Sequence, residues 1–254
     1  MLVKTDLICD IGCVRQKNED IILLDGELYR DKSAQSKYEL TPEVRFVAIV
    51  ADGMGGHKGG DVASEIVAQQ FNEFVYNLPG KLSQEEVISR IKDWTQATHQ
   101  LLVHLSSVNR ELEEMGSTFC GMLFYEKMIF ILNIGDSRIY RFRDGIFKQL
   151  STDHSLRQLT GDMSIPNNII YNSFGGNDDV YIDVKNISGQ VFENDIFLIC
   201  SDGLADMVSD TEIEKTLIET VSAQKLVDKA KQAGGKDNIS VIIMQICQST
   251  NSGL

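Results

Sequence analysis

The feature that most constrains the fold is a set of six short apolar runs, each rich in β-branched and aromatic residues. Runs of this length and composition, set between polar segments, predict buried β-strands. Asp144-Gly145, between two such segments, predicts a tight β-hairpin. The runs occupy residues 44–51, 119–125, 128–134, 138–142, 196–200 and 239–247.

Two blocks of helical periodicity interrupt these runs. Apolar residues recur at helical spacing over 61–78, and Ser83 with Glu86 forms a capping-box signature for a helix that runs to about residue 109. A second pair follows near the end, at Ser209 and over 223–233. Strands, a helical pair, strands and another helical pair indicate an α+β domain of packed layers. The lack of regular βαβ alternation argues against a doubly wound parallel sheet.

Composition excludes several classes of protein. A formal net charge of −13 argues against a nucleic-acid partner, because binding to the phosphate backbone needs a basic face. The five cysteines are dispersed and form no CxxC pair, which disfavours a zinc site or a disulfide framework. The first residues lack the apolar core of a signal peptide, and no apolar stretch is long enough to cross a bilayer. We therefore expect a cytoplasmic monomer without a membrane segment.

Four aspartates lie at the ends of predicted strands. Asp52, Asp136 and Asp202 each follow an apolar run and are next to a glycine in the sequence. Asp237 lies just before the last predicted strand. Each Asp-Gly pair alone could be an ordinary turn. If the four converge, carboxylates about 5 Å apart would repel by roughly 3 kcal/mol per pair at an effective dielectric constant near 20. A hard divalent cation removes that repulsion and prefers oxygen ligands, so the pattern favours Mg²⁺ or Mn²⁺.

Seven short motifs occur in order around these acids. Individually each is weak, but together they cover nearly the whole chain and resemble the metal-dependent protein phosphatases of type 2C, the PPM family, in the bacterial form whose second motif reads DGMGGH. The resemblance implies a four-layer α-β-β-α sandwich of two antiparallel sheets flanked by helices, as one domain over 1–247 with a tail at 248–254. The motifs are GCVRQKNED (12–20), VADGMGGHKGG (50–60), GST (116–118), NIGDSR (133–138), TDHS (152–155), CSDGLADMVSD (200–210) and GGKDNIS (234–240).

The resemblance also assigns metal ligands to this chain. It implies two core ions bridged by Asp52, with Glu19 and the Gly53 carbonyl on one ion and Asp202 and Asp237 on the other. It further implies a weaker third ion between Asp136 and Asp202, with Asp206 nearby.

Two further residues receive roles in the reaction. The resemblance implies that Arg15 clamps the substrate phosphate through its planar fork and that Asp20 orients water. A metal-bridging water would hydrolyse phosphoserine or phosphothreonine in a single displacement, without a phosphoenzyme. The expected partners are a phosphorylated protein and a cognate serine/threonine kinase pathway.

Some features leave alternatives open. Met54 stands where many eukaryotic relatives carry a histidine thought to be the general acid, and a loop or packing role is expected for His57. The segment 156–174 is short and 26–43 is long for the family, which bears on substrate selection. A non-catalytic phosphoprotein-binding module of the same fold, or a hydrolase of small phosphate esters, would share most of these residues.

Overall fold

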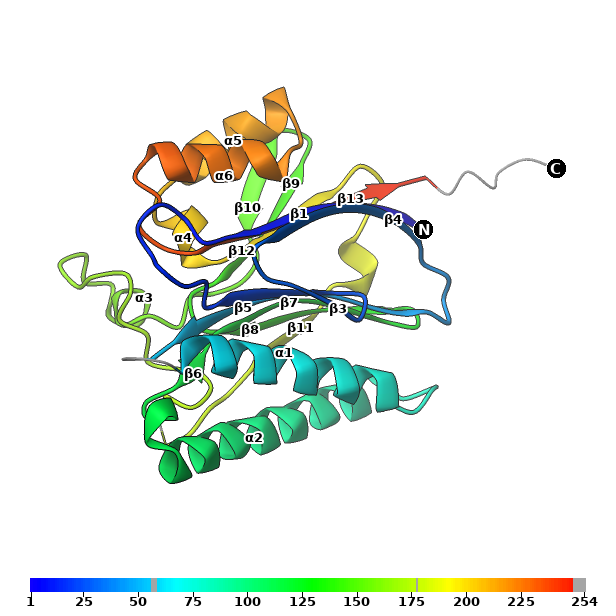
Figure 1. The fold of residues 1–254 in the computed structure, drawn as a ribbon. Helices are drawn as coiled ribbons and strands as arrows, with labels where there is room; N and C mark the ends of the chain where they lie inside the picture. The colour runs from blue at the N-terminus through cyan, green and yellow to red at the C-terminus, as the bar shows by residue number, and fades with distance from the viewer. Residues whose placement is uncertain (56–58, 177, 249–254) are drawn as a thin grey trace.

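Two antiparallel sheets pack face to face, and helices cover both outer faces (Figure 1). The computed structural model describes residues 1–55, 59–176 and 178–248. One sheet has six strands, in the spatial order β10 (Ile146–Gln149), β9 (Arg138–Arg143), β12 (Ile196–Cys200), β13 (Ile239–Cys247), β1 (Leu2–Asp10) and β4 (Lys32–Glu39).

The other sheet has seven strands, and β5 lies near its centre. Its order is β11 (Asp183–Asn186), β8 (Met128–Ile134), β7 (Phe119–Tyr125), β5 (Arg45–Met54), β2 (Asp20–Leu24) and β3 (Glu27–Tyr29), and the short β6 (Gly116–Ser117) pairs with the end of β5. The hairpin predicted at Asp144-Gly145 joins β9 to β10, and both residues have positive φ, as its tight turn requires.

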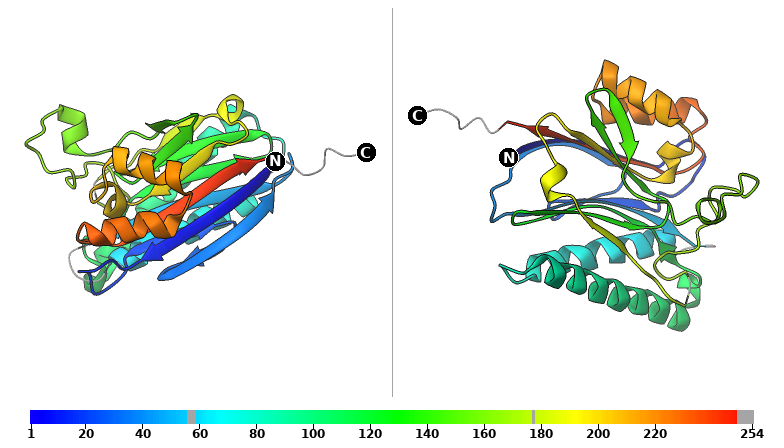
Figure 2. Two further views of the ribbon diagram at one scale, coloured as in Figure 1. Left: turned by 90° about the horizontal axis from the view of Figure 1, so that it is seen from above. Right: turned by 180° about the vertical axis from the view of Figure 1, so that it is seen from behind.

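Helices form the two outer layers. The long pair α1 (Gly60–Asn77) and α2 (Gln84–Val108) covers the seven-stranded sheet, and α5 (Asp210–Glu219) with α6 (Ala223–Gln232) covers part of the six-stranded sheet (Figures 1 and 2). The capping box predicted at Ser83 and Glu86 is present at the start of α2. Two short helices, α3 (Leu156–Thr160) and α4 (Asp202–Ala205), lie at the end of the sandwich. None of the helices in the described ranges is long and apolar enough to span a bilayer.

Three apolar layers hold the sandwich together. One lies between the two sheets, and one lies beneath each helical pair. Under α1 and α2, Phe71, Trp94 and Phe119 pack with ring centroids 4.8–5.1 Å apart, mostly edge to face. Removing one such buried ring costs about 3–5 kcal/mol, so this cluster strongly favours the observed position of the helical pair.

The structure matches the predicted α+β sandwich and contains each of the six predicted strands. One difference affects the site: β5 continues to Met54, so Asp52 lies inside a strand rather than after it. The strand extends to residue 52 and beyond because Asp52 is paired with Asp20 of the neighbouring strand β2. The tail predicted at 248–254 falls almost wholly outside the described residues, as does His57.

Candidate metal centre

A cleft of about 520 Å³ opens at one end of the sandwich and gathers most of the predicted site. Every residue predicted as a metal ligand lines it, together with Arg15. Asp20 does not line it and is fully buried beside Asp52. The lining is Arg15, Glu19, Asp52, Gly53, Met54, Gly55, Asp136, Asn168, Ile169, Ile170, Asp202 and Asp237. A cavity of about 570 Å³ on the six-stranded sheet contains none of these residues.

The GST motif fixes the backbone of Asp52. The Asp52 N–H donates to Thr118 Oγ1 at 3.0 Å, and the Thr118 N–H donates to the Asp52 carbonyl at 2.8 Å. Ser117 Oγ donates to the same carbonyl at 3.1 Å. Ser117, at the end of β6, and Thr118 therefore act as structural supports for the central acid.

Glu19 is held from two sides by backbone contacts. Its N–H donates to Asn238 Oδ1 at 2.8 Å, and its carbonyl accepts from the Gly53 N–H at 3.2 Å. Asn238 is buried, and its amide also donates to the Ile11 and Lys17 carbonyls at 3.0 Å. Sequence reasoning missed this asparagine as a site residue, although it lies within the quoted GGKDNIS motif beside Asp237.

Asp237 lies at the entrance to β13 and contacts Arg15. The Arg15 Nη2 group donates to Asp237 Oδ2 at 2.6 Å, and the Asn238 N–H donates to Asp237 Oδ1 at 2.8 Å. Both side chains remain partly exposed. The predicted phosphate clamp and one predicted metal ligand therefore meet on the same wall of the cleft.

Mutual repulsion and burial shape the electrostatics of the acids. Burial raises the pKa of Asp20 to about 7 and that of Asp202 to about 6, and neighbouring carboxylates add to both shifts. Burial likewise raises the pKa of Asp52 and of Asp136 well above the ordinary value, with repulsion from Asp202 contributing to each. The cluster therefore resists full ionisation by itself.

Unpartnered oxygens point to a cation. Among the described residues, buried Oδ1 atoms of Asp20, Asp136 and Asp202 have no hydrogen-bond partner. An unpartnered buried carboxylate oxygen is costly, and a hard divalent cation provides the missing contact. As the side chains stand, no group of three Asp, Glu, His or Cys residues in the described ranges is arranged to hold a metal ion. The carboxylate oxygens are the type of ligand that a hard divalent ion prefers. Within the part of the chain that the structure describes, the acids surround the cleft but are spaced too widely, as they stand, for three of them to hold one ion.

The TDHS motif stands at the start of a segment that borders the cleft. Asp153 pairs with Arg138 at 2.7 Å, and Ser155 caps α3. The buried His154 accepts the Gly135 N–H at 3.2 Å through Nδ1 and contacts Asp183 at 3.2 Å through Nε2. These contacts join the motif to β9, to β11 and to the turn at Gly135, so the motif has a structural role. Further along this segment, residues 168–170 reach the cleft.

Comparison with known proteins identifies the family. The sequence profile described as protein phosphatase 2C matches residues 24–233. The chain is 32% identical to the serine/threonine phosphatase stp of Listeria monocytogenes over 250 residues, covering 93% of each. It is also 32% identical to a putative protein phosphatase 2C-type of Streptococcus pyogenes, covering 95% of this chain and 97% of that one.

Solved structures agree with the sequence relatives. The serine/threonine phosphatase of S. agalactiae superposes with a TM-score of 0.81 at 26% identity, covering 96% of this chain and 99% of the other. The catalytic domain of the phosphatase PstP, solved with two manganese ions, superposes with a TM-score of 0.75 at 26% identity, covering 98% of this chain and all of that one. These matches confirm the predicted sandwich and the prediction of a metal-dependent serine/threonine protein phosphatase. The chain belongs to the protein phosphatase 2C family.

Proposed function

We propose that this chain hydrolyses phosphoserine and phosphothreonine in proteins, with Mg²⁺ or Mn²⁺ bound in the cleft. The observation that carries the proposal is the convergence of Arg15 with Glu19, Asp52 and the other acids in one cavity. A second support is the set of unpartnered carboxylate oxygens, which suits hard cations. The manganese ions in the related PstP structure support metal dependence.

The proposed ligands divide between two core ions and a weaker third. Asp52 would bridge the core ions, with Glu19 and the Gly53 carbonyl on one side. Asp202 and Asp237 would complete the other side, and Asp136 with Asp202 would hold the third ion. When bound, the ions would supply positive charge to the phosphoryl oxygens and lower the pKa of coordinated water towards neutrality.

Residues of the chain position the substrate and the water. Arg15 extends from the rim, where its side chain is 48% exposed, and its planar fork matches two phosphate oxygens. Asp20 is buried beside Asp52 in the neighbouring strand and accepts from Ser201 Oγ at 2.8 Å through Oδ2, and we propose that its carboxylate orients water from behind the cleft lining. Met54 lines the cleft and has no proton to donate, so we assign protonation of the leaving oxygen to water.

The surroundings of the cleft favour a polypeptide substrate over a small ester. A hollow of about 940 Å³ adjoins the cleft and shares Met54, Gly55 and Ile170 with it. It extends along the end of α2 as far as Arg110, which leaves room for residues flanking the phosphoryl group. We also propose that the protein is a monomer, which light scattering would test. We further propose that it acts in the cytoplasm, which cell fractionation would test, and that it reverses phosphorylation by a serine/threonine kinase.

One assay separates the candidate functions. The purified protein is given a phosphothreonine peptide and a panel of phosphometabolites, each with Mn²⁺ or with EDTA, and Asp52→Asn serves as the matched control. The proposal expects Mn²⁺-dependent release of phosphate from the peptide by the wild-type protein alone. Turnover of metabolites without turnover of the peptide would indicate a small-ester hydrolase. Peptide binding with no turnover of any substrate would indicate a non-catalytic module.

A further inference from the structure

The chain passes from one sheet to the other through two residues, Arg30 and Asp31. β3 ends at Tyr29 on the edge of the seven-stranded sheet, and β4 begins at Lys32 on the edge of the six-stranded sheet. Lys32 is paired with Cys9 near the end of β1, so the crossing lies at the same end of the sandwich as the cleft. The long polar segment 26–43 thus contributes to the scaffold beside the acids.

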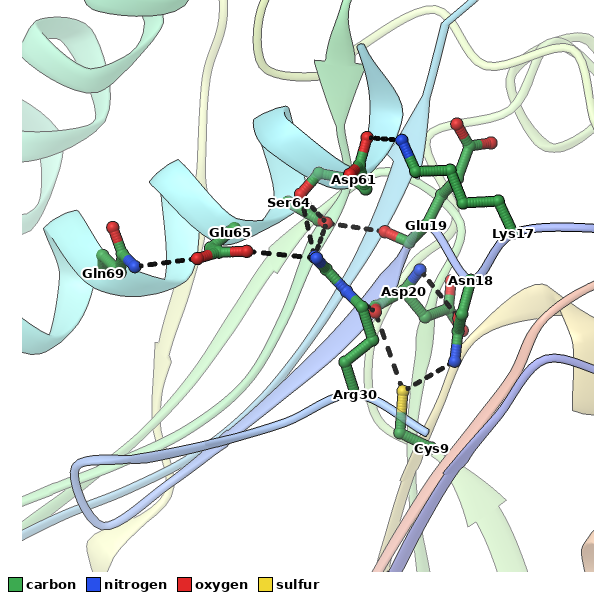
Figure 3. A network of polar contacts seen from close by, with 10 residues as sticks. All are labelled: Cys9, Lys17, Asn18, Glu19, Asp20, Arg30, Asp61, Ser64, Glu65 and Gln69. Carbon is green, nitrogen blue, oxygen red and sulfur yellow. Dashed lines mark hydrogen bonds and ion pairs between the residues drawn. The ribbon is translucent and has the colours of Figure 1, made fainter. Parts of the chain in front are cut away.

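The Arg30 guanidinium joins this crossing to helix α1 and to Asp20 (Figure 3). Nε donates to the Asp20 carbonyl at 3.1 Å, and Nη1 donates to Glu65 Oε2 at 3.0 Å. Nη2 donates to the Asp61 carbonyl at 2.8 Å and to Ser64 Oγ at 3.2 Å. The Arg30 side chain is only 22% exposed, although its partner Glu65 is 45% exposed, so the bonds to the two carbonyls and to the buried Ser64 are the better shielded ones.

Ser64 carries the connection on to Glu19. Its hydroxyl accepts from Arg30 and donates to the Glu19 carbonyl at 2.6 Å, and Ser64 is fully buried. That carbonyl also accepts the Gly53 N–H. Gly60, at the start of α1, lies so close to Glu19 that an added Cβ would be 2.7 Å from Oε1. The first turn of α1 therefore forms the surface against which Glu19 rests.

The neighbouring residue supports the other side of the same segment. Asp31 Oδ1 accepts from the Asn18 amide at 2.8 Å, and Asn18 Oδ1 accepts from the Asp20 N–H at 3.1 Å. Lys17 pairs with Asp61 in the first turn of α1 (Figure 3). The crossing thus makes contacts on both sides of Glu19.

We infer that Arg30 is a positioning residue for the metal centre: it holds the start of α1 and the backbone of Glu19 and Asp20 at a fixed spacing. The inference rests on the proposed metal site. A lysine could not replace it, because four acceptors on two segments, β2 and the start of α1, require the several donors of a planar fork. Partners of metal ligands commonly change metal affinity by about 10–100-fold when they are mutated.

The test measures Mn²⁺ binding by calorimetry on EDTA-treated protein. Arg30→Met and Arg30→Lys should each weaken Mn²⁺ binding by about tenfold or more, and Ser64→Ala should weaken it in the same direction. At saturating Mn²⁺ the KM for a phosphopeptide should stay near the wild-type value. The matched control is Arg45→Met, because Arg45 donates to the Val75 and Tyr76 carbonyls at 3.1 Å and so holds the opposite end of the same helix.

The outcomes separate positioning from general stability. Wild-type Mn²⁺ affinity in Arg30→Met would overturn the inference, as would an equal loss in Arg45→Met. If Arg30→Met does not fold, Arg30→Lys and Ser64→Ala decide the question, and unchanged affinity in both would overturn it. A wild-type protein that binds no Mn²⁺ would instead refute the proposed metal site, which is a different result.

Discussion

Arg15 Nη2 lies 2.6 Å from Asp237 Oδ2, although 222 residues separate them in the chain. The two side chains are 48% and 35% exposed, and exposed ion pairs contribute only about 0–1 kcal/mol. The pair is therefore weak enough for each member to take another partner. Arg15 is free to turn to a phosphate, and Asp237 to a cation.

Replacing Arg15 with alanine should raise the KM for phosphopeptides by about tenfold or more, because a charge-assisted hydrogen bond to the phosphate is lost. The loss in kcat should be smaller. Mn²⁺ affinity should not fall, since the change removes a positive charge beside Asp237. Steady-state kinetics and calorimetry measure these quantities, and Arg15→Lys keeps the charge without the fork. A collapse of kcat at unchanged KM would mean that Arg15 acts mainly in the transition state.

The proposed division of metal ligands predicts different effects for Asp237→Asn and Asp136→Asn. Asp237→Asn removes a core ligand, so both tight Mn²⁺ binding and turnover should collapse. Asp136→Asn leaves the proposed bridge at Asp52 untouched, so tight binding should persist while turnover falls steeply. Because Asp136 is 6% exposed and repelled by its neighbours, its neutral variant should also be at least as stable as the wild type without metal.

Two results would contradict this division. Wild-type turnover in Asp136→Asn would make Asp136 a turn residue and remove the third site. Loss of tight binding in Asp136→Asn equal to that in Asp237→Asn would place Asp136 in the core cluster. Calorimetry with Mn²⁺ distinguishes the two cases.

The stability of the metal-free protein should fall as the pH rises. Burial raises the pKa of Asp20 to about 7 and that of Asp202 to about 6, against about 3.9 in the unfolded chain. A group whose pKa is raised in the folded state contributes its full stabilisation below a pH of about 3.9. That stabilisation is lost as the pH rises to about 6–7. Mn²⁺ affinity should rise over the same window, because the ion competes with protons for the carboxylates.

Urea unfolding in EDTA at several pH values between 5 and 8 tests this dependence. Asp20→Asn should become progressively more stable than the wild type as the pH rises, because the variant has no charge to bury. A constant difference in the free energy of unfolding between the two proteins across this pH range would contradict the prediction. Mn²⁺ in excess should raise the Tm of the wild type.

Gly53→Ala should damage both the fold and the metal centre. An added Cβ would lie 2.0 Å from the Gly60 carbonyl oxygen and 2.6 Å from that of Glu19, so α1 would have to move away from the strand. Forced overpacking of this kind costs about 1–3 kcal/mol or more in the free energy of unfolding. Gly189→Ala is the matched control, because nothing lies within 4 Å of its added Cβ. Equal urea midpoints for Gly53→Ala and the wild type would refute the close-contact argument.

Six inner strands could be predicted closely from sequence because they are apolar and largely buried, whereas the inner strands β1 and β2 were not predicted. The prediction at 128–134 coincides with β8, and that at 239–247 coincides with β13. The edge strand β4 was missed, because its polar sequence KSAQSKYE contains no apolar run and it pairs along one side only. Short segments such as β11 and α3 were missed for a similar reason, since distant contacts define them.

The site residues could be identified because the motifs preserve their order along the chain. In the structure every predicted site residue except Asp20 lines one cleft, while the roles as ligands stay predictions. Arg30 gave no signal of its own: it follows a three-residue strand in a polar segment, and its importance depends on four acceptors that only the fold brings together. Similarly, the buried position of Asn238 could not be inferred from its neighbours in sequence.

The pairing of β13 between β12 and β1 has a consequence for how the chain folds. The register joins Leu2 to Cys247 and Asp10 to Ile239, so the sheet closes only after the most distant segments have met. Contacts of such long range slow folding, and without β13 the strands β1 and β12 would present open edges to other chains. Asp237 and Asn238 stand directly before β13. Catalytic activity should therefore return with the slowest phase of refolding, together with closure of the six-stranded sheet.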